Sequence, residues 1–475
     1  MSILDLTMVR GLASSNTFPN NCGGAIYNAS ALTLTRCRLI STAASLLGGA
    51  IYNDGQNGDA SLTTIDSSIT DCSAQASGGA IFNAGYTGHA TASLTNCTLD
   101  GNVATQYGGA IYNDGTVNGN AALTLTNCTI SNNRSNAGVG GNINNDGMNP
   151  DSSGIATILL RNNIFKRSTA ANTGVNLFND GGTFTSQGHN LSDDPAGGDG
   201  STAPGGYLNA AGDKRNTDPL LTGARDTNGG STYCMPLSAG SPAINAGDDT
   251  YAPAHDQRYF LRNGVSDIGA YEFNGTLGPV SVVSRKMHSG LGPFDVTLPV
   301  TGPAGVEPRN IGSGHQLVVI FPTTVTFSSA SVTAGNAVLG SVTGSGTSTA
   351  TINLTSAPDQ QLVTLTLFNA NDGVTTNNIP LRIGLLLGDA NGDGVVNSAD
   401  ATIARNASGQ VANASNFRGD FNLDGAINSA DATTARNNSG HSTPLGTTPE
   451  QIGKASDAPY QTEVPLPTPA QADEF

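Results

Sequence analysis

The chain contains no tryptophan, and aromatic residues make up only 5% of its 475 residues. Charged residues are also scarce at 12%, whereas glycine alone contributes 61 residues. This composition is typical of turn-rich β structure built from small polar side chains, and it argues against a helical enzyme with a large aromatic core. It also disfavours a carbohydrate-binding site made of aromatic platforms.

Positive charge is low too: 20 Lys and Arg stand against 36 Asp and Glu, which gives a formal net charge of −16. A protein that follows nucleic-acid phosphates needs basic patches, so nucleic acid is not an expected partner. No apolar run reaches the length that spans a membrane. Residues 1–7 lack the basic and apolar regions of a signal peptide and already have a β pattern, so we expect a sequence that is incomplete at its N-terminus.

Six cysteines are present, and three of them share one place in a repeated strand pattern. Cys37, Cys97 and Cys128 each follow Leu-Thr-x and precede x-Leu or x-Ile, and Ser67 interrupts the series. The pattern predicts a stacked interior column of buried free thiols. A disulfide between Cys97 and Cys128 is the alternative, because neighbouring rungs would lie about 4.8 Å apart.

The motif Gly-Gly-Ala-Ile-Tyr-Asn dominates the first part of the chain. It begins at Gly23, Gly48 and Gly108, and a Phe variant begins at Gly78. Looser copies begin at residues 140 and 174, so that consecutive starts lie 25, 30, 30, 32 and 34 residues apart. A repeat of this length indicates stacked units that cannot bury their apolar faces alone.

Each repeat contains short alternating strands and a turn, with no helical period between them. Leu123, Leu125, Cys128 and Ile130 are expected to point inward. Asn-Asp-Gly triplets that end at Gly55, Gly115, Gly147 and Gly181 are expected to form turns with positive φ. In-register stacking would form an amide ladder from one Asn of each repeat, namely Asn28, Asn53, Asn83, Asn113, Asn145 and Asn179. These features predict a right-handed parallel β-helix.

These residues resemble the Gly-Gly-Ala-Ile repeat proteins of the pectin-lyase-like superfamily. Gly-Ser-Pro-Ala-Ile-Asn-Ala-Gly at residues 240–247, Asp-Gln-Arg at 256–258 and Asp-Ile-Gly-Ala-Tyr-Glu at 267–272 resemble the C-terminal end of choice-of-anchor β-helix surface proteins. The resemblance covers residues 1–275 and implies a β-helix with a C-terminal closing segment. Residues 280–387 differ, because their β runs are separated by Gly, Ser and Asn turns; they predict an immunoglobulin-like β-sandwich.

Two 12-residue segments carry the pattern of calcium loops. Residues 389–400 and 420–431 place oxygen ligands at loop positions 1, 3, 5, 9 and 12, a main-chain carbonyl at position 7, and Gly at position 6. Ca²⁺ takes six to eight oxygen ligands, and the Gly permits the sharp turn around the ion. The predicted ligands are Asp389, Asn391, Asp393, Val395, Asn397 and Asp400, then Asp420, Asn422, Asp424, Ala426, Asn428 and Asp431.

Residues 388–409 and 419–440 are identical at 16 of 22 aligned positions, so the unit is duplicated. The pair resembles a dockerin domain of type I, which implies two Ca²⁺ ions, one per loop, and a cohesin-like partner. The helices predicted over residues 401–405 and 432–436 lack the long aliphatic residues usual in that family. We assign the module to residues 388–440, followed by a Pro-rich tail over 441–475 that we expect to be disordered.

Two functions are compatible with this organisation. The first is a secreted, calcium-binding surface protein with a protein-docking module and a non-catalytic, adhesive or structural β-helix, at the cell surface or outside the cell. The second is a carbohydrate-active enzyme, a polysaccharide lyase or O-glycosyl hydrolase in polysaccharide breakdown, with a polysaccharide or cell-surface glycan as partner. No catalytic residue can be named, so whether the chain is an enzyme stays open.

Two polar groups could suggest catalysis, and each also has a structural interpretation. The column of Asp54, Asp114, Asp146 and Asp180 could imitate a carboxylate cluster, but each residue lies in a turn triplet. A second group could be a salt-bridged closure of the β-helix; it comprises His255, Asp256, Arg258, Arg262, Asp267 and Glu272. Four other histidines, at positions 89, 189, 288 and 315, are isolated and lack metal-ligand spacing.

Overall fold

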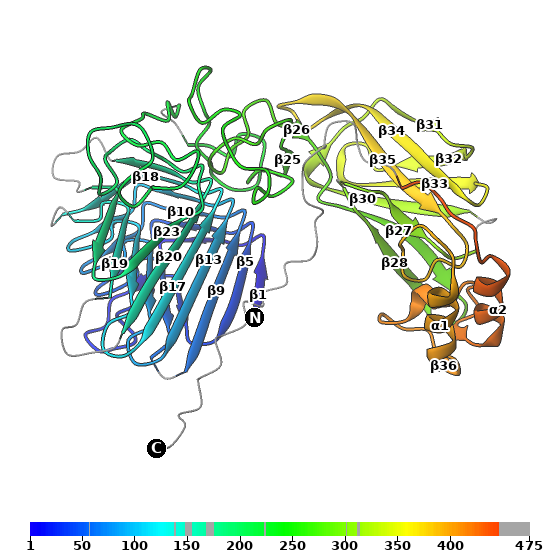
Figure 1. Ribbon diagram of the computed structural model, residues 1–475, viewed down its shortest axis with the longest axis horizontal. Helices are drawn as coiled ribbons and strands as arrows, with labels where there is room; N and C mark the ends of the chain where they lie inside the picture. The colour runs from blue at the N-terminus through cyan, green and yellow to red at the C-terminus, as the bar shows by residue number, and fades with distance from the viewer. Residues whose placement is uncertain are drawn as a thin grey trace, which may run out of the picture.

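The computed structural model describes residues 1–56, 58–136, 139–147, 154–167, 175–222, 225–300, 302–310 and 314–445. Figure 1 shows a stack of parallel strands coloured blue to green, covered at one side by green loops. A second group of strands, in yellow and light green, carries two short orange-red helices. Most of the Pro-rich tail predicted to be disordered, from residue 446 onward, lies outside the described residues.

The stack consists of three parallel sheets, because each turn of the chain adds one strand or more to each sheet. The first sheet contains β1 (Ser2–Leu4), β5 (Ala31–Thr35), β9 (Asp59–Ile65), β13 (His89–Thr95), β17 (Asn120–Thr126), β20 (Ile155–Arg161) and β23 (Thr183–Ser186). The second contains β2 (Thr7–Val9), β6 (Arg38–Ile40), β10 (Ser68–Thr70), β14 (Thr98–Asp100), β18 (Thr129–Ser135), β21 (Ile164–Arg167) and β24 (Leu191–Ser192), with β3 (Leu12–Ala13), β7 (Ala43–Ala44), β11 (Ser73–Ala74) and β15 (Val103–Ala104). The third contains β4 (Ile26–Asn28), β8 (Ile51–Asp54), β12 (Ile81–Ala84), β16 (Ile111–Asp114), β19 (Ile143–Asp146) and β22 (Leu177–Asp180). The predicted parallel β-helix is confirmed.

The amide ladder runs along the third sheet. The Nδ2 of each ladder residue donates to the Oδ1 of the next, at 2.6 to 3.0 Å, from Asn28 through to Asn179. The Asn113 amide also donates to the carbonyls of Ala121 and Thr157, both at 3.2 Å. Because a buried amide needs partners for both its donors and its acceptor, the ladder fixes the register of the turns.

Glycine acts at a different place from the one predicted. In all four Asn-Asp-Gly triplets the Asn and Asp belong to a strand of the third sheet, and only the last triplet has a positive φ, at Gly181. The positive φ falls instead on the first Gly of the repeat motif, as at Gly78 (φ 69°). The second Gly is required by close packing, since a Cβ on Gly79 would lie 2.1 Å from the Gly109 carbonyl oxygen.

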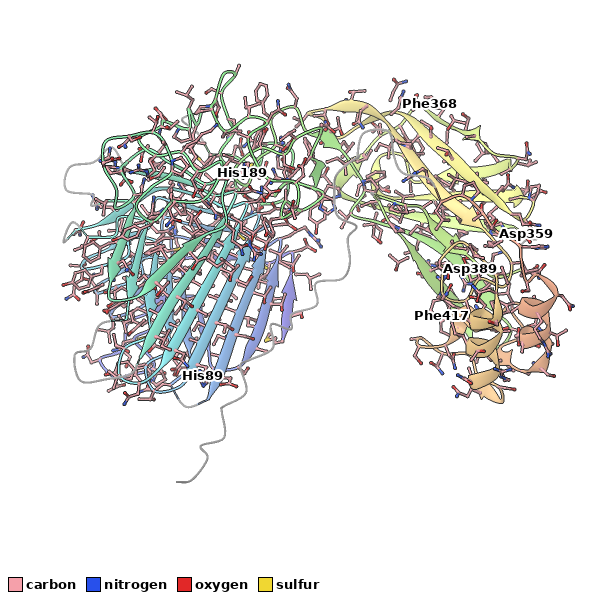
Figure 2. All side chains as sticks on the ribbon, viewed as in Figure 1. His89, His189, Asp359, Phe368, Asp389 and Phe417 are labelled. Carbon is pink, nitrogen blue, oxygen red and sulfur yellow. The ribbon has the colours of Figure 1, made fainter. Side chains whose placement is uncertain are left out.

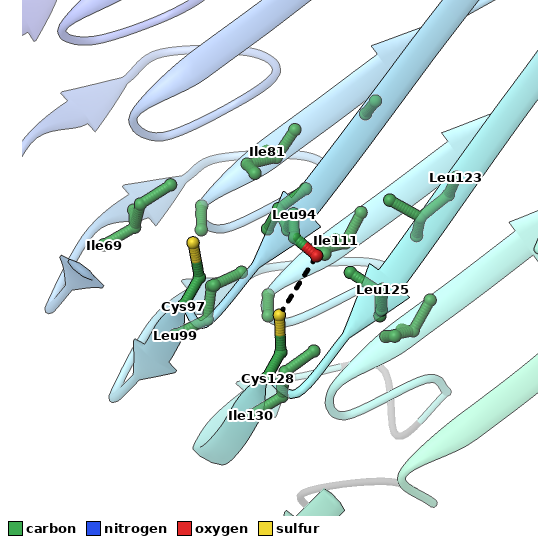
Figure 3. Packing of buried hydrophobic residues seen from close by; sticks show 14 of the residues in the cluster. Ile69, Ile81, Leu94, Cys97, Leu99, Ile111, Leu123, Leu125, Cys128 and Ile130 are labelled. Carbon is green, nitrogen blue, oxygen red and sulfur yellow. Dashed lines mark hydrogen bonds between the residues drawn. The ribbon is translucent and has the colours of Figure 1, made fainter. Parts of the chain in front are cut away.

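The interior of the stack is apolar and densely packed (Figure 3). Leu123, Leu125, Cys128 and Ile130 are at most 1% exposed, which confirms their predicted inward orientation. All six cysteines are buried and unpaired, so the free-thiol interpretation holds and the Cys97–Cys128 disulfide does not form. The Cys128 thiol donates to the Leu94 carbonyl at 3.4 Å, the bond drawn dashed in Figure 3.

A second ladder of amides lies on another corner of the stack, where the sequence did not suggest one. Asn102 Nδ2 donates to Asn133 Oδ1 at 2.9 Å, Asn133 to Asn142 at 2.9 Å, and Asn142 to Asn176 at 2.7 Å. The signal was present, because Thr42, Cys72, Asn102 and Asn133 each lie three residues after an inward Leu or Ile. This position was not recognised as a ladder because it is occupied by Thr, Cys and Asn in different repeats.

The chain leaves the stack through a loop-rich segment and a small hairpin of β25 (Phe260–Leu261) and β26 (Thr276–Leu277). Two antiparallel groups follow. One contains β27 (Ser281–His288), β28 (Gly292–Leu298), β30 (His315–Val325), β32 (Val338–Thr343) and β33 (Thr347–Ser356). The other contains β29 (Gly305–Glu307), β31 (Ser329–Ala334), β34 (Gln361–Asn371) and β35 (Thr376–Leu385), with β29 parallel to β35. Both sheets contribute to one apolar core, so they form a sandwich.

The last described part of the chain is a small helical unit. It contains α1 (Ser398–Asn406), β36 (Gln410–Val411), η1 (Phe417–Gly419), β37 (Ala426–Ile427) and α2 (Ser429–Asn437). Its core combines small residues such as Ala404 and Ala435 with the larger Phe421, and it also includes Val306 of the sandwich. Among the described residues, no helix combines the length and apolarity needed to cross a membrane.

We expect Asn113→Leu to destabilise the β-helix by about 2–4 kcal/mol, because Asn83 and Asn145 each lose a buried partner. Urea unfolding followed by circular dichroism would measure the loss. Asn179→Leu is the matched control, since it removes the last rung and costs only Asn145 an amide partner, while Asn145 keeps its bond from Asn113; the loss of stability should be about half as large. An unchanged midpoint in Asn113→Leu would contradict the ladder.

The second prediction concerns acid stability. His315 is 1% exposed, and neither ring nitrogen has a hydrogen-bond partner among the described residues. Burial, with a contribution from Lys286, lowers the pKa of His315 to about 4. In the unfolded chain this histidine binds a proton near pH 6.5, whereas in the folded chain it stays neutral until about pH 4. The free energy of unfolding therefore decreases as the pH falls from 6.5 towards 4.

Acidification from pH 7 to 4.5 should therefore cost the wild-type chain about 2–3 kcal/mol more than it costs His315→Leu. Guanidinium unfolding at both pH values gives the comparison. Equal losses in the two proteins would show that His315 does not stay neutral in the folded state.

Candidate functional site

The two predicted calcium loops have the same fold, and each runs into a helix. Asn397 caps α1, where its side chain accepts from the Ala399 amide at 2.8 Å, and Asn428 caps α2 in the same way. Asp400 and Asp431 stand at the third helical position and complete a capping box. A cap of this kind satisfies free amides at the helix start and places a carboxylate against the loop.

The ends of the first loop are buried and meet each other. Asp389 Oδ1 and Oδ2 accept from the amides of Gly392 (2.7 Å) and Gly394 (2.9 Å). Asp400 accepts from the Asn391 amide at 3.2 Å and the Asn397 amide at 2.8 Å. Both carboxylates are 0% exposed, and Gly394 adopts φ 86°, which lets the loop close.

The middle of the first loop lies on the surface. Asn391 Nδ2 donates to Asp393 Oδ2 at 2.8 Å, and Asp393 Oδ1 accepts from the Val395 amide at 2.9 Å. The Val395 carbonyl accepts from the half-buried Asn397 at 3.5 Å. Hydrogen bonds within the loop therefore connect the predicted ligands, and the residues at positions 3, 5 and 7 are exposed.

The second loop repeats these contacts with one difference. Asn422 donates to Asp424 at 2.9 Å, the Ala426 carbonyl accepts from Asn428 at 3.3 Å, and Asp431 accepts from the Phe421 and Asn428 amides. The difference is at Asp420. Its Oδ2 accepts both from the Gly425 amide and from His288, whereas its Oδ1 is buried without any partner among the described residues.

His288 was missed by the sequence, in which it looked isolated. Its Nδ1 lies 2.6 Å from Asp420 Oδ2, although 132 residues separate the two positions. The spacing of residues in the sequence does not indicate a contact between side chains so far apart in the chain. Figure 2 shows Asp389 and the nearby Phe417 where the helical unit meets the sandwich.

The charge of the loops favours a cation. Burial raises the pKa of Asp389, and the neighbouring carboxylates of Asp400 and Asp393 raise it further. Burial and Asp420 act in the same direction on the pKa of Asp431. A bound divalent cation would relieve this repulsion and would supply the partner that Asp420 Oδ1 lacks, so the residues fit a hard ion with oxygen ligands.

Within the part of the chain that the structure describes, no three His, Cys, Asp or Glu side chains are grouped closely enough to hold a metal ion by themselves. Each loop combines three carboxylates, at positions 1, 5 and 12, with amide and main-chain oxygens at positions 3, 7 and 9, so carboxylates are only half of the six predicted donors. Oxygen sites of this mixed kind are typical of Ca²⁺.

On the β-helix, the aspartates of the predicted column accept hydrogen bonds from neighbouring residues. Asp54 accepts from the Gln56 amide and the Tyr27 hydroxyl. Asp114 accepts from the amide and hydroxyl of Thr116. These contacts support the turn interpretation over a catalytic cluster.

The polar group near the end of the β-helix forms buried ion pairs. Arg258 pairs with Asp256 at 2.6 Å, and Arg262 pairs with Glu272 at 3.1 Å, all at most 4% exposed. Arg262 also donates to Asn96 of the stack at 3.1 Å. This network ties the closing segment to the β-helix, in agreement with the structural interpretation.

A hollow that the sequence did not suggest lies on the second sheet. It has a volume of about 480 Å³ and is lined by Asp71, Asp100, Arg225, Asp226 and Tyr233, among others. Arg225 reaches over from the closing segment and pairs with both Asp71 and Asp100. The loop that carries Arg225 is 154 residues from Asp71, so the sequence gave no sign of the contact.

These features define a parallel β-helix protein that ends, after antiparallel sheets, in two EF-hand-like loop–helix units. Residues 387–438 match the family model of the dockerin type I domain, so the chain is a β-helix protein with a C-terminal dockerin. Dockerin type I domains bind calcium and typically bind cohesins, and proteins that carry them are typically extracellular or on the cell surface. No curated protein and no solved structure matches the chain.

Proposed function

We propose that the chain binds two Ca²⁺ ions, one in each loop, through the twelve residues predicted from the sequence. The observation that carries the proposal is Asp420 Oδ1, a buried carboxylate oxygen without a partner among the described residues in a loop of otherwise satisfied oxygens. A buried carboxylate oxygen without a partner is costly, and a bound cation would remove that cost. The matching form of the first loop extends the assignment to both.

The dockerin is the docking module, with the exposed faces of α1 and α2 as its contact surface for a cohesin-like partner. The two helices pack through Ala404 and Ala435, which leaves Arg405 and Arg436 outside. A hollow of about 150 Å³ between the helices is lined by both arginines. Short helices without large buried residues depend on the loops for their placement, so docking should require calcium.

We assign the β-helix a structural or adhesive role outside the cell. Its polar residues are engaged in ladders, turns and closure contacts rather than in a free constellation, as the two amide ladders show. The β-helix would then act as a spacer or a surface for glycan or protein contact, and the dockerin would attach it to its partner.

Calcium titration of the full chain, previously stripped with chelator, tests the proposal. Calorimetry should show two ions bound. Asp389→Ala combined with Asp400→Ala should remove one ion and leave the second, because these buried carboxylates close only the first loop.

Asp59→Ala with Asp199→Ala is the matched control, since it removes two exposed charges far along the chain from the loops. This control should still bind two ions. No calcium binding by the wild-type chain, or two intact sites in the loop variant, would refute the assignment.

A second candidate function, polysaccharide cleavage, is favoured by the hollow at Asp71, Asp100 and Arg225. Glycoside hydrolysis requires two carboxylates facing one substrate bond, and lyases require a base near a bound acidic sugar. Here Arg225 could meet a substrate carboxylate, and the side chain of Asp100 is 5% exposed beside the more open Asp71.

A panel of polysaccharides, assayed for reducing-sugar release and for unsaturated-product absorbance, tests this candidate. If the hollow is catalytic, Asp100→Asn should lower the rate by about a hundredfold or more, because general acid–base catalysis contributes 10²–10⁴-fold. Asp180→Asn, in the aspartate column, serves as control. Absence of product from the whole panel would leave the structural role.

A further inference from the structure

We propose that the β-sandwich completes the second calcium loop, with His288 as the residue that positions Asp420. The inference rests on the proposed calcium function and adds to it a division between the loops. Calcium affinity of the second loop depends on a neighbouring domain, whereas that of the first does not. Calcium bound at the second loop would in turn fasten the dockerin to the sandwich.

A chain of buried side chains links the sandwich interior to this loop. Glu307 Oε1 and Oε2 accept from Nε and Nη2 of Arg309, both at 2.8 Å. Arg309 Nη1 lies 2.9 Å from His288 Nε2, and His288 Nδ1 lies 2.6 Å from Asp420 Oδ2. All four side chains are 0% exposed.

The direction of each bond follows from the chemistry of arginine. A guanidinium can only donate, so the Nε2 of His288 accepts from Arg309. The proton of the neutral ring is therefore on Nδ1, which donates to Asp420. His288 occupies one oxygen of the carboxylate and leaves Oδ1 as the oxygen without a partner, free for the ion.

The first loop provides an internal comparison. Both carboxylate oxygens of Asp389 accept from amides of their own loop, and the described contacts include no sandwich side chain at this carboxylate. The loop is backed instead by the segment that follows α2, where the Val396 amide donates to His441 and the Thr443 amide to Gly394. A nearly identical sequence thus stands in two different environments.

Further contacts between the sandwich and the helical unit surround these buried side chains. The Ser289 amide donates to the Leu423 carbonyl at 2.9 Å, and the Asn310 amide donates to the Phe421 carbonyl at 2.8 Å. Phe294 of the sandwich stacks on Phe417 of the helical unit at 5.3 Å, and His288 packs edge-on against both rings. In such a site a hydrogen bond to a metal ligand is strong, and partners of this kind orient the ligand.

Reciprocity follows from thermodynamic linkage. If contact with the sandwich strengthens calcium binding, calcium must strengthen contact with the sandwich by the same free energy. The two amide bonds to Leu423 and Phe421 lie at the junction and would report this change.

The test measures calcium binding to each loop separately in the full chain. Asp389→Ala with Asp400→Ala leaves only the second loop, and Asp424→Ala with Asp431→Ala leaves only the first while keeping Asp420 beside His288. His288→Leu and His288→Asn are then added to each background. The asparagine can donate from nearly the position of Nδ1, whereas leucine cannot.

In the second-loop background, His288→Leu should weaken calcium binding by about 10- to 100-fold, the usual cost of losing such a partner, and His288→Asn should recover most of it. In the first-loop background the same substitutions should leave affinity unchanged. Equal affinities with and without His288→Leu, an equal loss in both loops, or no recovery by asparagine would overturn the inference.

A folding defect in His288→Leu is covered by a second measurement on chains that retain His288. In the second-loop background, adding Ca²⁺ should slow amide hydrogen exchange at Ser289 and Asn310; unchanged exchange would also overturn the inference. Absence of calcium binding in every background that retains His288 would refute the calcium function itself. Binding that ignores His288 would refute only the role of the sandwich.

Discussion

Amide groups buried between stacked turns hold the β-helix in register. Every Asn side chain in the ladder except the last, Asn179, donates to the Asn of the next turn and to nearby carbonyls. A slip of one residue would leave donors and acceptors unpaired along the whole column. The spacing between rungs grows to 32 and 34 residues at Asn145 and Asn179, yet the pairing of strands stays in step. Additional residues are therefore accommodated in the connections, and the ladder sets the geometry.

A stack of parallel strands must end somewhere, and its last turn would expose apolar and backbone groups. Residues 196–208 cover the last turn, because Ala196 and Leu208 belong to the interior core of the stack and Tyr207 stacks on Phe184. The closing segment, with the buried pairs Arg258–Asp256 and Arg262–Glu272, lies instead along one side of the stack, where Arg262 donates to Asn96. The hairpin that follows continues into the next domain, because Phe260 and Leu277 belong to the core of the sandwich. The sandwich in turn supplies a fixed base for the dockerin, through Glu307, Arg309 and aromatic contacts.

The two loops of the dockerin have nearly the same sequence but different surroundings. They share most of their residues and the same helix caps, and they differ in what lies behind the first aspartate. Both oxygens of Asp389 accept from loop amides, whereas His288 and the Gly425 amide share Oδ2 of Asp420 and leave its Oδ1 without a partner among the described residues. The proposed calcium sites would thus differ in their coupling to the rest of the chain despite their common origin.

Local and repeated features could be predicted from the sequence. The β-helix, the Asn ladder, the inward Leu and Cys positions, and the loop–helix units all follow from spacing, because identical residues in stacked turns meet one another and loop ligands lie within 12 residues. The predicted position of the positive φ was wrong, because in most turns it falls on the first Gly of the repeat motif and, among the Asn-Asp-Gly triplets, only on Gly181.

Only the tertiary structure decided the contacts between separate parts of the chain. Arg225 reaches Asp71 across 154 residues, and His288 reaches Asp420 across 132. Such pairs depend on how whole surfaces dock, which is set by shape and burial summed over many residues. A single sequence records periodicity directly, but it carries no local mark of which distant surface a side chain will meet.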